Sequence, residues 1–141
     1  MKKLIFVPQK TDFSCGPACI ETVMSLMGGA AGFHQEFIGK ALGTAPKVGT
    51  DHRLLGEWCR EHAVIESMGC NTYSGKGIAI ANILNPFSGN GHFVVFLYRD
   101  SKVTRYYCPL LNRIVTMRTP ELEWRNGAGN LKAWSVNFAF V

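Results

Sequence analysis

The chain contains 141 residues, of which 47% are hydrophobic and 18% are charged, and its formal net charge is +5. This length suits one domain with its own core, which we expect to span residues 1–141, and the composition excludes an intrinsically disordered protein. The C-terminal third is rich in basic residues, but they do not form a run interleaved with aromatic side chains, so we expect no nucleic-acid partner. These basic residues are Arg99, Lys102, Arg105, Arg113, Arg118 and Arg125.

The N-terminus lacks the features of an export signal. Its apolar stretch, residues 4–7, ends at Pro8, whereas the apolar part of a signal peptide needs about 7–15 residues. No run in the chain approaches the roughly 18 apolar residues of a membrane span. We therefore expect a cytoplasmic protein that does not insert into the membrane.

The cysteines favour free thiols. There are five of them, an odd number in a chain without an evident secretion signal, which argues against a disulfide framework. Cys15 and Cys19 are four residues apart, but no second pair completes a zinc-binding spacing. The Gly75-Lys76-Gly77 segment is too short for a phosphate-binding loop. We expect neither a metal nor another cofactor.

The first half of the chain is mainly helical in pattern, after a short strand expected at residues 4–7. Apolar residues at three- and four-residue spacing follow the Gly16-Pro17 step and predict a helix that ends at Gly28-Gly29. A shorter helix is expected over residues 35–42. A third helix begins after the N-cap residue Asp51, and its expected apolar stripe contains Leu54, Leu55, Trp58, Cys59 and His62.

The pattern then changes to short β-branched and aromatic runs separated by turn residues, which predict strands. One more helix is expected over residues 119–125, with Thr119 as its cap and Pro120 in its first position. Helices followed by strands indicate an α+β domain in which N-terminal helices pack on a C-terminal, largely antiparallel sheet. The expected strands cover residues 64–68, 78–84, 92–98, 103–107, 113–117 and 134–141.

The segment from Gln9 to Pro17 carries a candidate nucleophile. Cys15 stands at the start of the first long helix, where the positive end of the helix dipole favours a thiolate. Gln9, six residues earlier, has an amide that can donate a hydrogen bond to an oxyanion formed when the thiolate attacks a carbonyl. These residue types predict a cysteine hydrolase.

Among the four histidines, His92 is the best candidate for the base. His34 and His52 lie next to expected helix starts, and His62 is on an apolar stripe, so all three suit solvated or core positions. His92 follows the turn at residues 88–91 and begins an apolar strand. A rigid strand end is suited to hold an imidazole against a thiol on a facing helix.

Gln9, the Cys15-Gly16-Pro17-Ala18 step and the later Gly91-His92-Phe93-Val94-Val95 run together resemble papain-like peptidases that cleave double-glycine leaders from bacteriocin precursors. The resemblance extends over nearly the whole chain, including the Gly49-Thr50 step and the last, tryptophan-containing strand. It implies a papain-like fold and a peptide or protein substrate. The family's peptidase domain is usually fused to a membrane exporter, which implies that a separate exporter is a partner here.

The resemblance also implies roles for individual residues. Cys15 would be the nucleophile, His92 the general base and later the acid, and Gln9 the oxyanion donor. The family normally orients its histidine with an aspartate that precedes a proline, and this chain has Cys108-Pro109 at that place. Cys108 would therefore be a weak orienting group, a thiolate partner or a small apolar filler. Asp100 and Asn112 are the other candidates for orienting His92.

Three functions remain open from the sequence. The first is a peptidase that forms an acyl-enzyme on Cys15. The second is a papain-fold deamidase, transglutaminase-like enzyme or effector that uses the same thioester chemistry on a protein side chain. The third is a degenerate domain that binds a leader peptide without cleaving it, which the missing aspartate motivates and the retention of both Cys15 and His92 opposes.

Overall fold

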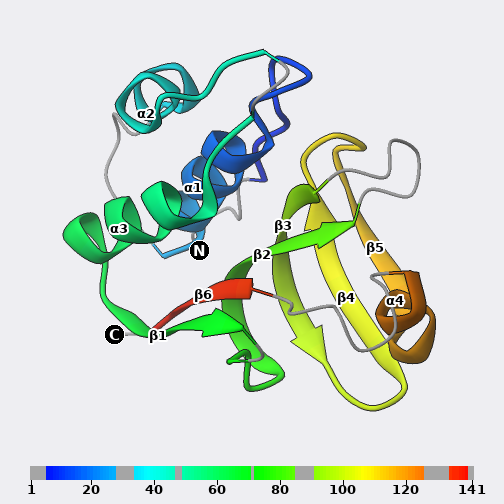
Figure 1. The fold of residues 1–141 in the computed structure, drawn as a ribbon. Helices are drawn as coiled ribbons and strands as arrows, with labels where there is room; N and C mark the ends of the chain where they lie inside the picture. Colours follow the sequence, from blue (N-terminus) through cyan, green and yellow to red (C-terminus); the bar gives the residue numbers. More distant parts are fainter. Residues whose placement is uncertain are drawn as a thin grey trace.

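Three helices precede a six-stranded sheet in this protein, for which a computed structural model describes residues 6–27, 34–46, 49–70, 72–84, 91–125 and 134–139 (Figure 1). A fourth helix lies between the last two strands. In chain order the elements are α1 (Cys15–Leu26), α2 (Gln35–Leu42), α3 (His52–His62), β1 (Ile65–Cys70), β2 (Lys76–Leu84), β3 (Gly91–Arg99), β4 (Val103–Cys108), β5 (Arg113–Arg118), α4 (Thr119–Arg125) and β6 (Trp134–Phe138).

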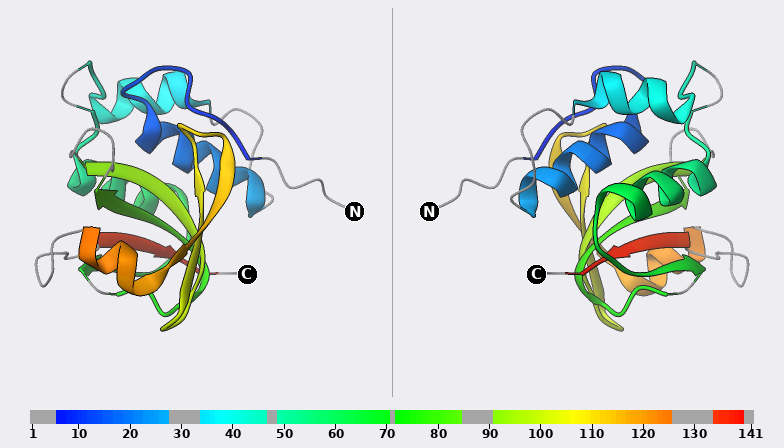
Figure 2. Two further views of the ribbon diagram at one scale, coloured as in Figure 1. Left: turned by 90° about the vertical axis from the view of Figure 1, so that its right-hand side faces the viewer. Right: turned by 90° about the vertical axis from the view of Figure 1, so that its left-hand side faces the viewer.

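The strands form one antiparallel sheet in the order β1-β6-β2-β3-β4-β5. The last strand in sequence, β6, therefore lies between β1 and β2. The three N-terminal helices gather on one side of the sheet and α4 lies on the other (Figures 1 and 2). This arrangement confirms an α+β fold with N-terminal helices packed on an antiparallel sheet.

Each face of the sheet has its own core, because successive side chains of a strand point to opposite faces. On one face, Ile20 and Val23 of α1 pack against Val95, Tyr107 and other strand residues. The opposite face is covered by Leu122 of α4, and its buried strand residues are Ala79, Ala81, Ile83, Val94, Phe96, Tyr106 and Cys108.

Close packing surrounds the start of α1, where residues 16–20 are all buried. A Cβ atom added to Gly16 would lie 3.0 Å from Thr50 Oγ1 and 3.2 Å from Leu55 Cδ1. The absence of a side chain at Gly16 thus lets the start of α1, which carries Cys15, approach the start of α3.

The predicted apolar stripe of α3 is only partly correct. Leu55 and Cys59 are fully buried, but Leu54 is 46% exposed and His62 is also exposed. His62 instead stacks on Trp58 at a ring-centroid distance of 4.0 Å, and its Nδ1 lies 2.8 Å from the Trp58 carbonyl oxygen. Trp58 packs against the core beside Leu55 and Cys59. The apolar face of α3 is therefore narrower than the sequence pattern indicates, because it excludes Leu54 and His62.

The expected strand at residues 4–7 is wrong in its described part. Phe6 and Val7 belong to no strand, and the Val7 N–H donates to Thr22 Oγ1 on α1 at 2.9 Å. The predicted helix end at Gly28-Gly29 lies outside the described residues. The other expected helices and strands are present with end shifts of a few residues, although the last two residues of the 134–141 strand also lie outside the described part. Within the described ranges, no helix has the length and apolarity needed to cross a membrane.

Candidate active site

Cys15 is the first residue of α1 and its side chain is partly exposed. Burial raises the pKa of the Cys15 thiol, while hydrogen bonds from the backbone N–H groups of Phe93, Gly16 and Cys15 itself lower it, and burial has the larger effect. The pKa is therefore above its ordinary value. The expectation that the helix start holds a thiolate is wrong for the free protein, because desolvation of the sulfur outweighs the nearby donors.

The contact with Phe93 brings the Cys15 thiol to the start of β3. Phe93 directly follows His92, which is the second residue of that strand. Cys15 and Phe93, 78 positions apart in sequence, thus meet where the start of a helix faces the start of a strand. The pairing of the Cys15 thiol with the His92 ring stays a prediction. Within the described part of the chain, however, neither ring nitrogen of His92 forms a hydrogen bond with the Cys15 thiol.

His92 is only 7% exposed. Burial lowers the pKa of its imidazole to about 4, because a low-dielectric surrounding disfavours the charged ring. At neutral pH the free protein therefore holds a neutral His92 imidazole and a neutral Cys15 thiol, and not a thiolate–imidazolium pair.

Cys108 contacts the imidazole of His92. Its Sγ lies 3.3 Å from His92 Nε2, because the pairing of Val95 with Tyr107 places the end of β4 beside the start of β3. If Nε2 carries the proton and donates to sulfur, Nδ1 is left bare and can act as a base. Cys108 is also 5% exposed and packs in the second core, so it both contacts the His92 ring and fills space in that core.

The two alternative orienting residues are engaged elsewhere. Asp100 accepts hydrogen bonds from the Tyr98 hydroxyl at 2.8 Å and from two backbone N–H groups of the β3–β4 turn. Asn112 accepts from the Tyr107 hydroxyl at 2.8 Å. Neither contacts His92 in the described structure, which leaves Cys108 as the side chain that contacts its far nitrogen.

Gln9 lies next to this group, since its backbone N–H donates to the carbonyl oxygen of Pro109 at 3.1 Å. Its side-chain Nε2 donates to the carbonyl oxygen of Thr11 at 2.8 Å. The other end of the amide, Oε1, is buried and has no hydrogen-bond partner. In the opposite orientation of this amide, the NH₂ group would occupy the buried position instead of the oxygen.

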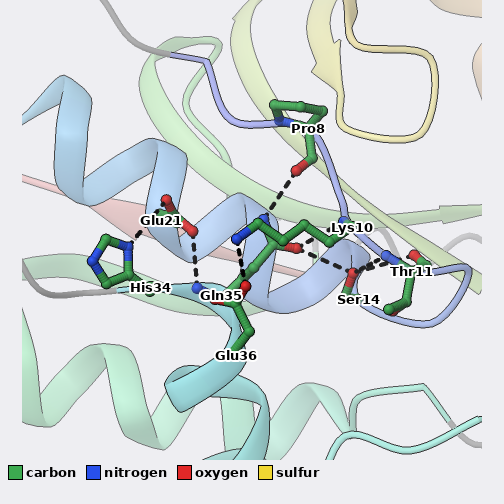
Figure 3. Close-up of polar contacts among 8 residues, drawn as sticks. All are labelled: Pro8, Lys10, Thr11, Ser14, Glu21, His34, Gln35 and Glu36. Atoms are coloured by element: carbon green, nitrogen blue, oxygen red, sulfur yellow. Dashed lines mark hydrogen bonds and ion pairs between the residues drawn. The ribbon is translucent and has the colours of Figure 1, made fainter.

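Gln35, the first residue of α2, is a site-associated residue that the sequence did not reveal. It is 2% exposed and hydrogen-bonds to the segment between Pro8 and Ser14 (Figure 3). The α2 pattern is weak and a helix-start glutamine is ordinarily exposed, so no feature of the sequence separates Gln35 from a surface residue.

The described residues contain no group of three or more metal-ligating side chains. No protein-family model matches the chain, and no curated protein matches it. The chemistry of the site is therefore inferred from its own residues: a thiol, an imidazole with a sulfur on its far nitrogen, and an amide beside them.

Proposed function

We propose that this protein is a cysteine peptidase of papain-like fold, in which Cys15 attacks the carbonyl carbon of a peptide bond. The observation that carries the proposal is the meeting of the α1 and β3 starts. There the Cys15 thiol accepts the Phe93 N–H, and the neighbouring His92 has Nε2 in contact with Cys108 at 3.3 Å. A nucleophile, a base and a group on the far nitrogen of the base are the parts that thiol acyl transfer requires.

In the proposed reaction the Cys15 proton passes to the bare Nδ1 of His92 as sulfur bonds to the carbonyl carbon. The carbonyl oxygen becomes an oxyanion, for which the donors are the N–H groups at the start of α1 and the Gln9 amide in its rotated orientation. The C–N bond then breaks, and the amine leaves with the proton from His92. Water, deprotonated by the same ring, hydrolyses the thioester.

The proposed substrate is a peptide or protein, and the resemblance to leader peptidases suggests cleavage after two glycines. A separate exporter would then receive the product, and the reaction would take place in the cytoplasm. A deamidase would use the same thioester and differ in the bond that it breaks, so the Cys15 chemistry alone does not distinguish the two.

A non-catalytic peptide-binding domain is the second candidate, and specific observations favour it. The Cys15 thiol and the His92 ring share no hydrogen bond in the described structure, and the Gln9 NH₂ group is bonded to Thr11. Catalytic hydrogen bonds are often long before substrate binds. The peptidase is therefore preferred, because a protein that only binds peptides needs neither a thiol at the start of α1 nor a histidine beside the strand residue that this thiol contacts.

The test is acylation by acetyl-Gly-Gly 4-nitrophenyl ester, followed by nitrophenol release and by mass mapping of the acyl group. Cys70 is exposed and would react without specificity, so Cys70→Ser serves as the background. We expect an acyl group on Cys15 that turns over. Cys15→Ala should abolish the reaction, and His92→Ala should slow it by roughly 10²–10⁴-fold, the usual contribution of a general base.

Acylation of lysines only, or equal rates with and without His92, would contradict the proposal. A peptide mixture treated with the enzyme then separates the reactions: new chain ends identify a peptidase, and conversion of side-chain amides to carboxylates identifies a deamidase. Tight binding of a double-glycine peptide without acylation of Cys15 would establish the second candidate.

A further inference from the structure

The side chain of Gln35 spans the two peptide groups on either side of Gln9. Its Nε2 donates to the carbonyl oxygen of Pro8 at 2.9 Å, and its Oε1 accepts the N–H of Lys10 at 2.9 Å (Figure 3). In the opposite amide orientation, the oxygen would face the Pro8 carbonyl oxygen and the NH₂ group would face the Lys10 N–H. These two partners therefore define which end of the amide is oxygen. One buried side chain thus holds the backbone both before and after the oxyanion-donor candidate.

The same oxygen of Gln35 reaches the residue before the nucleophile. Ser14 Oγ lies 3.2 Å from Gln35 Oε1 and also 3.2 Å from the carbonyl oxygen of Thr11, and its single proton serves one of them at a time. Ser14 Oγ in turn accepts the Thr11 N–H at 3.0 Å. The whole segment from Pro8 to Ser14 is therefore tied to one amide, which is itself removed from water.

Helix α2, which carries Gln35, is anchored to the helix that carries Cys15. The Gln35 N–H donates to Glu21 Oε1 of α1 at 2.8 Å. The preceding residue, His34, is the N-cap but makes no side-chain cap hydrogen bond, so Glu21 supplies the acceptor that the helix start needs. The position of Gln35 is thereby set relative to α1, and through it the position of Gln9 relative to Cys15.

We propose that Gln35 is a positioning residue, which holds the Gln9 amide within reach of the oxyanion formed at Cys15. This inference rests on the proposed function. Donors must be placed closely to stabilise a transition-state charge, and a displacement of about 1 Å can lower a rate roughly 100-fold. A buried amide with three partners can hold a loop that closely, since breaking any of its hydrogen bonds leaves a buried polar group unsatisfied.

The first test compares Gln35→Leu, Gln9→Ala and the double variant, all in the Cys70→Ser background. With the 4-nitrophenyl ester, Gln35→Leu should lower kcat by roughly 10–100-fold and change KM little, because the lost donor acts on the oxyanion. The double variant should be no slower than Gln9→Ala, since Gln35 acts through Gln9. The rate of Cys15 alkylation by iodoacetamide should stay within twofold, because alkylation forms no oxyanion.

Glu36→Gln is the matched control. Glu36 is the neighbour of Gln35, and its exposed side chain pairs with Lys10 of the same segment. Removing its charge leaves every Gln35 hydrogen bond in place, so ester turnover should be unchanged. The proposal would be overturned if the rate losses of the two single variants multiplied in the double variant, or if the alkylation rate fell in parallel with turnover. Either result would show that Gln35→Leu disturbs the whole structure around Cys15.

A second variant, Gln35→Glu, gives a readout that does not require loss of the side chain. Its ionised carboxylate faces the Pro8 oxygen as an acceptor against an acceptor, whereas the protonated acid can donate to Pro8 and still accept from Lys10. Turnover should therefore rise as pH falls through the pKa of the introduced carboxyl, with no such step in the parent. An identical pH profile would overturn the proposal.

Hydrogen exchange at the Lys10 amide separates this inference from the proposed function. In the parent and in Glu36→Gln this amide should be protected, and in Gln35→Leu it should exchange faster while α1 amides keep their protection. Unchanged Lys10 exchange overturns the tie to Gln35, whatever the activity. Lost protection in a protein whose Cys15 is never acylated overturns the proposed function, and with it the role of Gln35 in positioning an oxyanion donor.

Discussion

Burial sets the protonation states of Cys15 and His92, and thereby the resting state of the proposed site. A thiol that loses water holds its proton more tightly, and an imidazole that loses water releases its proton more readily. Both shifts are opposite to those of a preformed ion pair. A substrate that brings the developing oxyanion charge into the site is needed before charge separation becomes favourable.

The lowered pKa of His92 predicts a loss of stability in mild acid. The unfolded chain binds a proton at the ordinary histidine pKa of about 6.5, whereas the folded protein binds it near 4, so stability is full above 6.5 and falls as pH decreases toward 4. The contribution is on the order of 3 kcal/mol, since one pKa unit corresponds to about 1.4 kcal/mol.

Urea unfolding at pH 7.0 and 4.5 measures this loss, and His92→Gln is the control that removes the titrating ring. The difference in unfolding free energy between the two pH values should be smaller in His92→Gln by about 2–3 kcal/mol. An equal pH dependence in both proteins would show that the His92 ring is not held neutral by the fold.

Cys108 predicts a second residue-level effect. Cys108→Asp places a carboxylate at His92 Nε2, which should raise the His92 pKa and stabilise the imidazolium. Ester turnover should then increase by at most roughly tenfold for each unit by which the His92 pKa rises, because a more basic ring accepts the thiol proton more readily. Cys108→Ala, which leaves Nε2 without its sulfur contact, should lower turnover.

NMR titration of the His92 ring, run beside the turnover assay, tests whether the two changes have the same origin. A Cys108→Asp protein that folds but keeps the His92 pKa would contradict the orienting role. A protein that fails to fold would show that residue 108 serves mainly the second core, where an unpaired carboxylate is strongly destabilising.

Among the helices and strands, the contacts of the α1 start with α3 and of the α2 start with the Gln9 segment position the candidate residues. The α1 start can reach α3 because residue 16 has no Cβ, and the α2 start holds the Gln9 segment through Gln35. Two helical glycines therefore differ in their expected tolerance of a methyl group. Gly16 is tightly enclosed, while a Cβ at Gly39 would meet Pro17 and Thr44 at 3.7 Å, an ordinary contact distance.

Gly16→Ala should destabilise the protein by about 1–2 kcal/mol, because Thr50 and Leu55 must move in a packed region. Gly39→Ala, its matched control in α2, should stabilise by about 0.5–1 kcal/mol, the usual gain from replacing glycine in a helix. Urea denaturation of the two variants measures both values. A Gly16→Ala protein as stable as the parent would contradict the close packing of the α1 start.

For the whole molecule, the central feature is the insertion of β6 between β1 and β2. Val136 pairs with Ile80 on one side and Met68 on the other, and Val136 and Ile80 are fully buried. Asn137 adds hydrogen bonds to Ser67 and Thr72 near the β1 edge. Strand β6 therefore joins β1 to the β2–β5 part of the sheet, in which all neighbouring strands are consecutive in sequence.

Truncation after residue 133 should accordingly abolish cooperative folding, because β1 loses its described partner strand and both faces of the sheet lose buried contacts. Circular dichroism during thermal unfolding measures this. Cys70→Ser, on the exposed end of β1, is the control and should remain within about 0.5 kcal/mol of the parent. A sharp unfolding transition in the truncated protein would show that β6 is an accessory strand.

Much of the fold was predictable because helix and strand periodicity are local properties of the chain. Helix α1 follows from apolar residues at three- and four-residue spacing, and β3 and β4 follow from β-branched and aromatic runs between turns. The position of His92 near a strand end follows from its place after a turn. The sheet order was not predictable, since nothing local distinguishes a strand that inserts between two others. The predicted apolar stripe of α3 was too wide for the same reason, because packing by β1 and β6 residues decides which α3 side chains are covered.

Local patterns in the sequence therefore predicted the α+β class and the placement of Cys15 and His92 near element starts, and they identified Gln9, Cys15, His92 and Cys108 as candidates. The tertiary structure decided which of them touch, and in which protonation state. Desolvation and hydrogen bonding depend on residues that are distant in sequence, as with Phe93 at the Cys15 thiol. The contacts of Gln35 with residues 8–10 depend on the packing of α2 against the segment before Cys15, so they could not be predicted from the sequence.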